Sequence, residues 1–282
     1  EANPGTVTEE KLAAFARSGV TRLSLGVQSF NAASLSFLGR IHTARQAREA
    51  VTWAKNTFAH VNIDMMYALS GQTQADLRAD AEEAVSFNTD HLSYYELTIE
   101  PGSVFFKRPP ENLPDADTAG DMAECIQTIT RKAGFDHYEV SAYAKAGSRC
   151  RHNMTYWTYG DYLAIGAGAH AKITTPDGAI FREVRAKSPA RYMTDVENGT
   201  FVQRRRRVRP EEIPFEFMLN VLRLREGVAK ERWEEATGLP YALIAPKVAS
   251  LQREGLMEKT DRLAATALGR RFLNTLQERF LP

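Results

Sequence analysis

The clearest alternation of polar and apolar side chains runs through residues 21–28, whose sequence is TRLSLGVQ. Strand side chains point alternately to the two faces of a sheet, so this segment is predicted to be a strand with one polar face. Residues 61–66 repeat the pattern. Two such strands joined by a helix indicate a barrel built around a polar ligand, with helices on its outer face. The polar columns are Arg22, Ser24, Gly26 and Gln28 in the first strand, and Asn62 and Asp64 in the second.

Helical patterns separate these strands. Thr43 and Gln46 form a capping box before one helix, a second helix is predicted over residues 74–87, and a strand over 91–97 follows. This alternation predicts parallel strands with right-handed crossovers. Further predicted elements are a helix over 118–133, a strand at 138–141, a loop over 143–159, a hairpin over 173–184 and a helix ending at Glu197.

A shift in composition marks the basic run at residues 204–207. We expect residues 1–205 to form a partial barrel with its C-terminal extension, and residues 206–282 to form a helical, winged-helix-like domain. Within the second part, the pattern predicts a helix over 239–254, a strand that begins at 255–257, and a helix over 267–280.

The composition is that of an ordinary globular protein. The 282 residues are 43% hydrophobic and carry a net charge of +1, which predicts no special attraction to nucleic acid or membrane. No apolar run approaches the ~20 residues of a membrane helix, and no signal-peptide pattern is present. Two cysteines make no disulfide framework, so a reducing cytoplasm is expected. Glu1 stands, without a Met, directly before a helix signal, which predicts a fragment of a longer protein.

Polar residues at or just beyond the strand ends are the first candidate site. Gln28 offers an amide, Asp64 accepts hydrogen bonds from ribose hydroxyls or an amine, and Arg40 can grip a carboxylate. With Glu1 they suit a zwitterionic, ribose-bearing ligand. The alternatives are a network of paired charges in the lumen and, for Glu1, a solvated terminal residue, which spacing alone favours.

An aromatic cluster around His152 is the second candidate site. His152 and Asn153 precede Tyr156 and Trp157 in the predicted loop, where histidine can ligate haem iron and the rings can stack on a flat ligand. Spacing alone favours an ordinary hydrogen-bonded histidine beside core aromatics.

Three other features carry less chemistry. The glycines of residues 166–171 do not make a dinucleotide loop, because a strand rather than a helix follows them. Cys125 is expected in the core and Cys150 in a loop, and the two cannot hold a cubane cluster alone. The run at 204–207 can touch phosphate, although a solvated linker paired with Glu211 and Glu212 is favoured.

Several motifs, in order along essentially the whole chain, resemble those of the radical S-adenosylmethionine (SAM) coproporphyrinogen III oxidase-like family. The last of them points to the HemW-like haem chaperones within that family rather than to the true oxidases. The motifs are Glu1-Ala-Asn-Pro4, Arg22-x-Ser24-x-Gly26-Val27-Gln28-Ser29-Phe30, Leu38-Gly39-Arg40-x-His42, Asp64-Met-Met-Tyr67-Ala-Leu69-x-Gly71-Gln72-Thr73, Leu97-Thr-x-Glu100-Pro101-Gly102, Tyr138-Glu139-x-Ser141 and His152-Asn153-x-x-Tyr156-Trp157.

The resemblance implies an α/β fold: a partial radical-SAM (β/α) barrel, truncated at its N-terminus, with a small winged-helix-like C-terminal domain. It implies that Glu1, Gln28, Arg40 and Asp64 contact SAM, and that Thr98 lies near the methionine part of SAM. It also implies a [4Fe-4S] cluster, and haem that is passed to acceptor proteins such as respiratory enzymes. Association with a membrane is expected through those partners, and binding of nucleic acid is not expected.

Two departures from the family pattern concern the cluster and SAM. The Cys-x3-Cys-x2-Cys loop that holds the family's cluster is absent from this sequence, and so is its Gly-rich SAM-binding segment. The cluster ligands are therefore expected outside this chain, and no metal site is expected within it. A barrel unit takes ~30 residues, so three missing strands correspond to roughly 90 residues. Ala68 and Ser70 stand where Gly and Pro are usual.

These observations predict a haem chaperone of the radical SAM superfamily, and whether the protein is also an enzyme stays open. One alternative is an oxygen-independent coproporphyrinogen III dehydrogenase, which would turn over coproporphyrinogen with SAM and a reductant. The other is a winged-helix nucleic-acid-binding module, whose binding of duplex DNA would be sensitive to salt.

Overall fold

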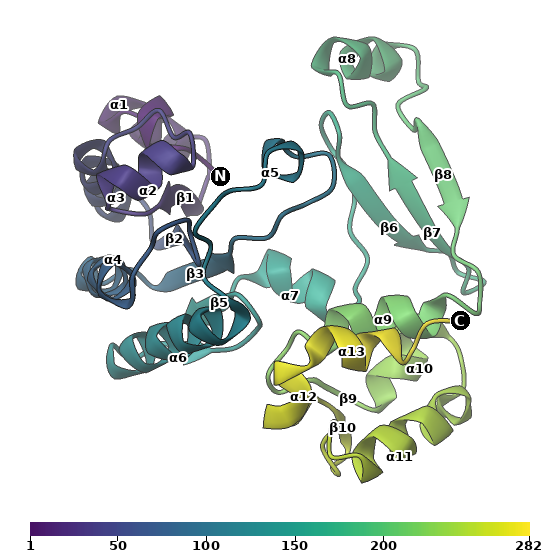
Figure 1. Cartoon of the computed structure of the whole chain (residues 1–282). Coiled ribbons are helices and arrows are strands. Elements are labelled where there is room, and N and C mark those ends of the chain that lie inside the picture. Colours follow the sequence, from purple (N-terminus) through teal and green to yellow (C-terminus); the bar gives the residue numbers. More distant parts are fainter. The chain divides into compact units, whose positions relative to one another are not determined.

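The computed structural model describes residues 1–282, which divide into two compact units, Glu1–Arg149 and Cys150–Pro282. The first unit packs helices on one sheet, and the second combines a small sheet with a group of helices (Figure 1). The domain boundary that we expect between residues 205 and 206 stays a prediction. None of the helices has the length and apolar character that crossing a membrane requires.

The first unit is built on a five-stranded sheet with the order β1-β2-β3-β5-β4. The first three strands pair in parallel, and the last two extend the sheet in antiparallel pairing. The predicted parallel neighbours joined by helices are thus confirmed, in a sheet that stays open rather than closing into a barrel. The strands are β1 (Arg22–Gln28), β2 (His60–Tyr67), β3 (His91–Glu96), β4 (Asp136–His137) and β5 (Ala142–Ala144).

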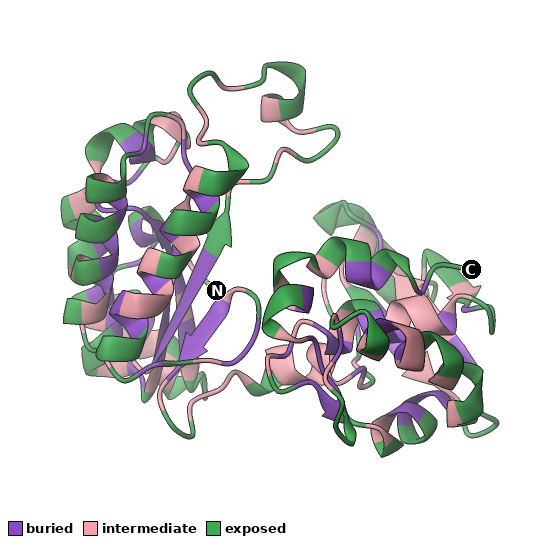
Figure 2. Cartoon of the chain, turned by 60° about the horizontal axis from the view of Figure 1, so that its bottom comes forward, coloured by how far each residue is buried: buried purple, intermediate pink, exposed green.

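Helices cover the apolar face of this sheet. The crossover helices α3 and α4 both begin at capping boxes, formed by Thr43 with Gln46 and by Thr73 with Asp76. Apolar strand residues such as Ile63 are fully buried under them, so burial is concentrated in the strands (Figure 2). The helical segments are η1 (Pro4–Thr6), α1 (Glu9–Arg17), α2 (Ala32–Phe37), α3 (Ala44–Thr57), α4 (Gln74–Ser86), α5 (Val104–Lys107) and α6 (Ala116–Lys132).

The prediction of a strand at residues 138–141 is wrong. These residues form the turn between β4 and β5, in which the Ala142 N–H donates to the Glu139 carbonyl and the Tyr138 N–H donates to the Ala142 carbonyl, each at 3.2 Å. The local backbone bonds close a turn here, and Tyr138 is buried within it, which gives the segment the apolar character of a strand.

The second unit contains an antiparallel sheet of β6 (His170–Thr174), β7 (Ile180–Val184) and β8 (Arg204–Arg207). The predicted hairpin is confirmed by β6 and β7. The linker expected at residues 204–207 is wrong, because these arginines form the edge strand β8. Their expected acidic partners are confirmed in part: Arg206 Nη1 lies 2.6 Å from Glu212 Oε2. Arg205 lies over the ring of Phe181 at 4.2 Å, which packs the strand onto β7.

The rest of the second unit is helical, with a two-stranded antiparallel wing of β9 (Val228–Ala229) and β10 (Arg262–Leu263). Gly227 leads into the wing with φ +57°, and a Cβ there would lie 2.0 Å from the Leu263 carbonyl oxygen, so this close approach requires glycine. The helices are α7 (Arg151–Trp157), α8 (Pro189–Glu197), α9 (Ile213–Val221), α10 (Glu231–Thr237), η2 (Tyr241–Leu243), α11 (Ala245–Arg253), α12 (Ala267–Arg271) and α13 (Leu273–Glu278).

Four predictions in this unit need correction. The loop expected over residues 143–159 contains α7. The helix expected over 239–254 is divided into η2 and α11, because a proline at the start of α11 lacks the N–H that would continue the helix. The strand expected at 255–257 is only an isolated bridge from Met257 to Ala265. The helix expected over 267–280 breaks at Phe272, whose ψ of 39° leaves the helical range.

Candidate functional site

The polar face of the parallel strands carries a hydrogen-bonded cluster centred on Asp64. Ser24 Oγ donates to Asp64 Oδ2 at 2.7 Å, and Asn62 Nδ2 donates to Asp64 Oδ1 at 2.8 Å. Asn62 Nδ2 also lies 2.7 Å from Ser24 Oγ. The alternation in the sequence correctly predicted that these side chains share a face, and both carboxylate oxygens of Asp64 are held in place.

The electrostatics of this face are acidic. Burial raises the pKa of Asp64, the hydrogen bonds from Ser24 and Asn62 oppose that rise, and the nearby carboxylate of Glu1 adds to it. Burial, with the charge of Asp64 as the next contribution, raises the pKa of Tyr95 to about 12. A face with two carboxylates and a neutral phenol favours a ligand that brings a positive charge or hydroxyl donors.

The end of β1 is shaped around Gln28. This residue has φ +70°, and the register of β1 on β2 shifts between Gly26 and Gln28. A Cβ on Gly26 would lie 2.9 Å from Gln28 Nε2 and 3.2 Å from Asn3 Oδ1, and Arg40 Nη1 donates to the same Asn3 oxygen at 3.2 Å. Gln28 and Arg40 therefore converge beside Gly26, whose register partner on β2 is Asp64. The glycine keeps this face free of a side chain.

Glu1 lies at the outer edge of β1. The next residue, Ala2, forms a parallel bridge with Leu25, in which the Ala2 N–H donates to the Ser24 carbonyl at 2.9 Å and the Gly26 N–H donates to the Ala2 carbonyl at 3.0 Å. This pairing brings the Glu1 carboxylate near enough to Asp64 to influence its ionisation. The structure thus groups Glu1, Gln28, Arg40 and Asp64 at one end of the strands.

Thr98 makes no hydrogen bond to these four residues. It follows β3 and is exposed, and its hydroxyl donates to the Glu96 carbonyl at 3.4 Å rather than to any of them. A contact between Thr98 and SAM stays a prediction.

Sequence analysis missed the contribution of β3. His91 Nδ1 lies 2.6 Å from Asn62 Oδ1, His91 Nε2 lies 2.9 Å from Tyr138 Oη, and Ser93 Oγ donates to Asn62 Oδ1 at 3.1 Å. The signal was present, because His91, Ser93 and Tyr95 alternate with apolar or aromatic neighbours as the residues of the first two strands do.

The aromatic cluster of the second unit is carried by α7. His152 is exposed and makes no hydrogen bond, and its ring packs edge-on against Tyr156 with the ring centroids 4.7 Å apart. Tyr156 in turn contacts Tyr162, and Arg223 lies 4.2 Å above the ring of Trp157. The buried indole Nε1 of Trp157 has no hydrogen-bond partner. The hydrogen-bonded core histidine that spacing favoured is therefore not what the structure shows.

Neither cysteine belongs to a metal site. Cys125 lies on α6 and packs against the core of the first unit, while Cys150 is half-buried at the N-cap of α7. No group of three or more His, Cys, Asp or Glu side chains is arranged to hold a metal ion. An iron–sulfur cluster is held by several thiolates, so the residues present do not fit a [4Fe-4S] cluster.

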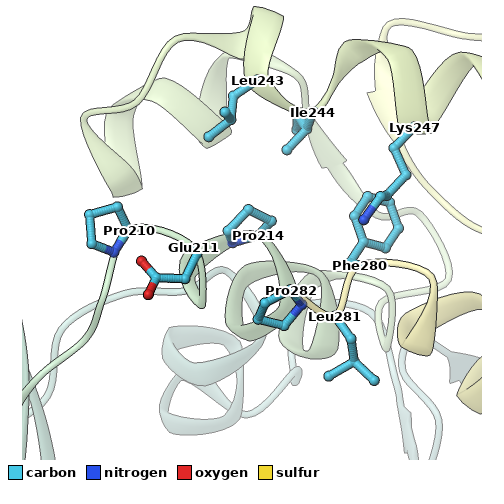
Figure 3. A pocket seen from close by; sticks show the side chains of 9 residues that line it. All are labelled: Pro210, Glu211, Pro214, Leu243, Ile244, Lys247, Phe280, Leu281 and Pro282. Atoms are coloured by element: carbon cyan, nitrogen blue, oxygen red, sulfur yellow. The ribbon is translucent and has the colours of Figure 1, made fainter.

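A separate pocket of about 430 Å³ lies in the second unit, among the start of α9, the segment of η2 and α11, and the last residues of the chain (Figure 3). Its walls contain no imidazole or thiolate, so they provide no strong ligand for haem iron. The lining residues are Pro210, Glu211, Pro214, Leu243, Ile244, Lys247, Phe280, Leu281 and Pro282.

Comparisons with known proteins first define the class. The sequence model of the radical SAM superfamily matches residues 1–84, and that of the HemN C-terminal domain matches residues 208–272. The solved structure of coproporphyrinogen III oxidase (HemN) from Escherichia coli, described as a radical SAM enzyme, gives a TM-score of 0.78. It is 18% identical, and the match covers 99% of this chain and 68% of that one. The chain has a HemN-like radical SAM fold with a HemN C-terminal domain.

Two curated relatives narrow the class to a family. "Heme chaperone HemW" from Haemophilus influenzae is 41% identical over the whole of this chain and 73% of its own length. "Heme chaperone HemW" from Escherichia coli is 40% identical over the whole of this chain and 74% of its own length. The chain therefore belongs to the HemW family of the radical SAM superfamily.

Proposed function

We propose that this protein is a haem chaperone, which binds SAM on the polar face of its first unit, binds haem at His152 in its second unit, and delivers haem to acceptor proteins. The observation that carries the proposal is the state of His152, an exposed histidine without a hydrogen bond on an aromatic helix. A neutral imidazole with free ring nitrogens is a common ligand of haem iron. The name of the two relatives, heme chaperone, supports the same proposal.

The four grouped residues of the first unit match the chemistry of SAM. The carboxylates of Asp64 and Glu1 accept hydrogen bonds from an amine or from ribose hydroxyls, and the Arg40 guanidinium pairs with a carboxylate. Gln28 offers both a donor and an acceptor next to the open face of Gly26. When bound, SAM supplies an electrophilic sulfonium, and these side chains bind and orient it.

The cluster of the superfamily has no ligand set among these residues. We propose that its ligands lie outside these residues. Haem-acceptor proteins, among them respiratory enzymes, are the proposed partners, and the cytoplasm is the proposed compartment, with membranes reached through those partners. Nucleic acid is not a proposed partner, because Arg205 and Arg206 of the basic run are engaged with Glu183 and Glu212.

The test is an anaerobic haem titration of the full-length protein, followed by a coproporphyrinogen turnover assay with SAM and a reductant on the same sample. The proposal predicts a saturable haem spectrum without turnover. Turnover with consumption of SAM would make the protein a coproporphyrinogen dehydrogenase, and absence of haem binding would contradict the chaperone outright.

A further inference from the structure

A buried chain of hydrogen bonds leads away from Asp64 into the first unit. Asn62 Nδ2 contacts Asp64 Oδ1 at 2.8 Å, His91 Nδ1 contacts Asn62 Oδ1 at 2.6 Å, and Tyr138 Oη contacts His91 Nε2 at 2.9 Å. Asn62, His91 and Tyr138 are all nearly inaccessible to solvent. The chain crosses three elements, from β2 through β3 to the turn between β4 and β5.

The donors and acceptors fix the direction of this chain. The Asp64 carboxylate only accepts, so the amide nitrogen of Asn62 faces it and the amide oxygen faces His91. That oxygen cannot donate, so His91 carries its proton on Nδ1, and Nε2 accepts from the hydroxyl of Tyr138. Burial lowers the pKa of His91 to about 4, which agrees with a neutral ring that has one donor and one acceptor.

We propose that His91 is a positioning residue for SAM binding, which acts through Asn62 to hold the carboxylate of Asp64 in its binding orientation, with Tyr138 selecting the tautomer of His91. This inference rests on the proposed contact between Asp64 and SAM. His91 lies two hydrogen bonds from Asp64 and does not face the ligand itself. With Ser93, whose hydroxyl donates to the same amide oxygen at the longer distance of 3.1 Å, it keeps the Asn62 amide from rotating, since the flipped amide would present its oxygen to a carboxylate.

The strength of one such bond sets the size of the expected effect. Because one buried hydrogen bond makes a modest net contribution, losing the orientation of Asn62 should weaken binding about threefold to tenfold. The expected change is therefore smaller than the change caused by removing Asp64, and larger than that of a surface substitution.

The first experiment measures the affinity of the full-length protein for S-adenosylhomocysteine, which keeps the ribose and amino-acid groups of SAM. His91→Leu removes both ring nitrogens and should weaken binding about threefold to tenfold. His91→Asn keeps a donor near the position of Nδ1 and should restore most of the affinity. The matched control is His60→Leu, since His60 bonds to Asp90 on the same sheet but lies outside the chain of hydrogen bonds.

The second experiment reads the tautomer of His91 by NMR of the protein labelled with 15N-histidine, in the wild type and in Tyr138→Phe. The wild type should show a neutral ring protonated on Nδ1, and Tyr138→Phe should alter the Nε2 signal. A ring protonated on Nε2, or a charged ring at neutral pH, would overturn the proposal whether or not His91→Leu folds.

The two proposals fail in different ways. If Asp64→Asn leaves the affinity unchanged, the SAM contact proposed for Asp64 is wrong, and the NMR result still decides the direction of the hydrogen bonds. If Asp64→Asn weakens binding but His91→Leu does not, or if His91→Asn binds as weakly as His91→Leu, the contact stands and the positioning role of His91 is wrong.

Discussion

The two candidate sites differ in how firmly the structure holds their side chains. Asp64 lies within a sheet, and both of its carboxylate oxygens accept hydrogen bonds from Ser24 and Asn62. His152 lies on a helix of seven residues whose N-cap, Cys150, makes no side-chain cap bond, and its ring makes no hydrogen bond. The first site is preorganised for a small polar ligand, whereas the second leaves the imidazole of the proposed haem ligand without a fixed partner.

This difference suits the two proposed ligands. SAM is small and has several polar groups, so fixed partners reduce the loss of side-chain freedom on binding. Haem is cargo that a chaperone must release. An exposed histidine whose ring makes no hydrogen bond is not held in a single ring orientation. Substitutions in each site, with stability and ligand binding as the measured quantities, test whether the two sites differ in this way.

The largest predicted effect concerns pH and the first unit. Burial holds the pKa of His91 at about 4, well below the usual histidine value of about 6.5, so as the pH falls the unfolded chain takes up a proton before the folded chain does. The contribution of His91 to the free energy of unfolding should therefore be fully present above pH 6.5. It should fall by about 3 kcal/mol as the pH drops from 6.5 through 4. Urea unfolding at several pH values checks this.

His91→Asn provides the control for that measurement. The variant lacks the titrating ring, so its free energy of unfolding should fall less steeply between pH 6.5 and 4 than that of the wild type. Equal slopes in the wild type and His91→Asn would show that His91 is not held neutral by burial.

The next effect concerns SAM. Asp64→Ala and Arg40→Ala should each weaken SAM binding by about 1.5–3 kcal/mol, because each removes a charge-assisted contact. Calorimetric titration of the folded full-length protein measures the loss. Unchanged affinity for SAM in both variants would contradict the proposal that SAM binds on this face of the sheet.

Substitutions at helix N-caps should have smaller effects on the free energy of unfolding, a decrease in the first unit and an increase in the second. Thr43→Ala removes the cap of α3 and should cost about 1 kcal/mol of stability. Cys150→Ser introduces a hydroxyl at the uncapped start of α7 and should add up to about 1 kcal/mol. Thermal unfolding compares the two, and a loss of stability in Cys150→Ser would show that α7 does not need a side-chain cap.

The smallest effect on stability is expected at His152. Its exposed ring makes one aromatic contact, so His152→Ala should change the free energy of unfolding by no more than about 0.5 kcal/mol. The same variant should nevertheless alter the haem absorption spectrum. A large loss of stability would indicate that His152 is part of the packing instead.

The sequence predicted the parts of the fold that depend on local pattern. The alternation through residues 21–28 and 61–66 predicted two strands, which the structure shows as β1 and β2, and it placed Ser24, Asn62 and Asp64 on one face. It did not reveal their partner His91, although the same alternation continues in the third strand. The grouping of Gln28 with Arg40 and Asp64 was predicted from their places at or just beyond the strand ends, whereas SAM as their ligand came from the family resemblance.

The errors arose where tertiary contacts decide local structure. The sequence pattern does not predict helix α7, because Cys150 provides no capping side chain and the helix has too few residues for a helical period to repeat. The pattern predicts a strand at Tyr138, because its aromatic side chain is typical of strands, whereas the structure buries it in a turn. Both segments are only four to seven residues long, and their sequences do not distinguish helix from loop in α7 or turn from strand at residues 138–141.

The central claim is that haem and SAM bind at separate sites, and one measurement tests it most directly: anaerobic haem titration of the wild type, His152→Ala and Asp64→Ala. The account predicts an altered haem spectrum and weaker haem binding in His152→Ala, and wild-type haem binding in Asp64→Ala. Unaltered haem binding in His152→Ala, together with lost binding in Asp64→Ala, would contradict the account.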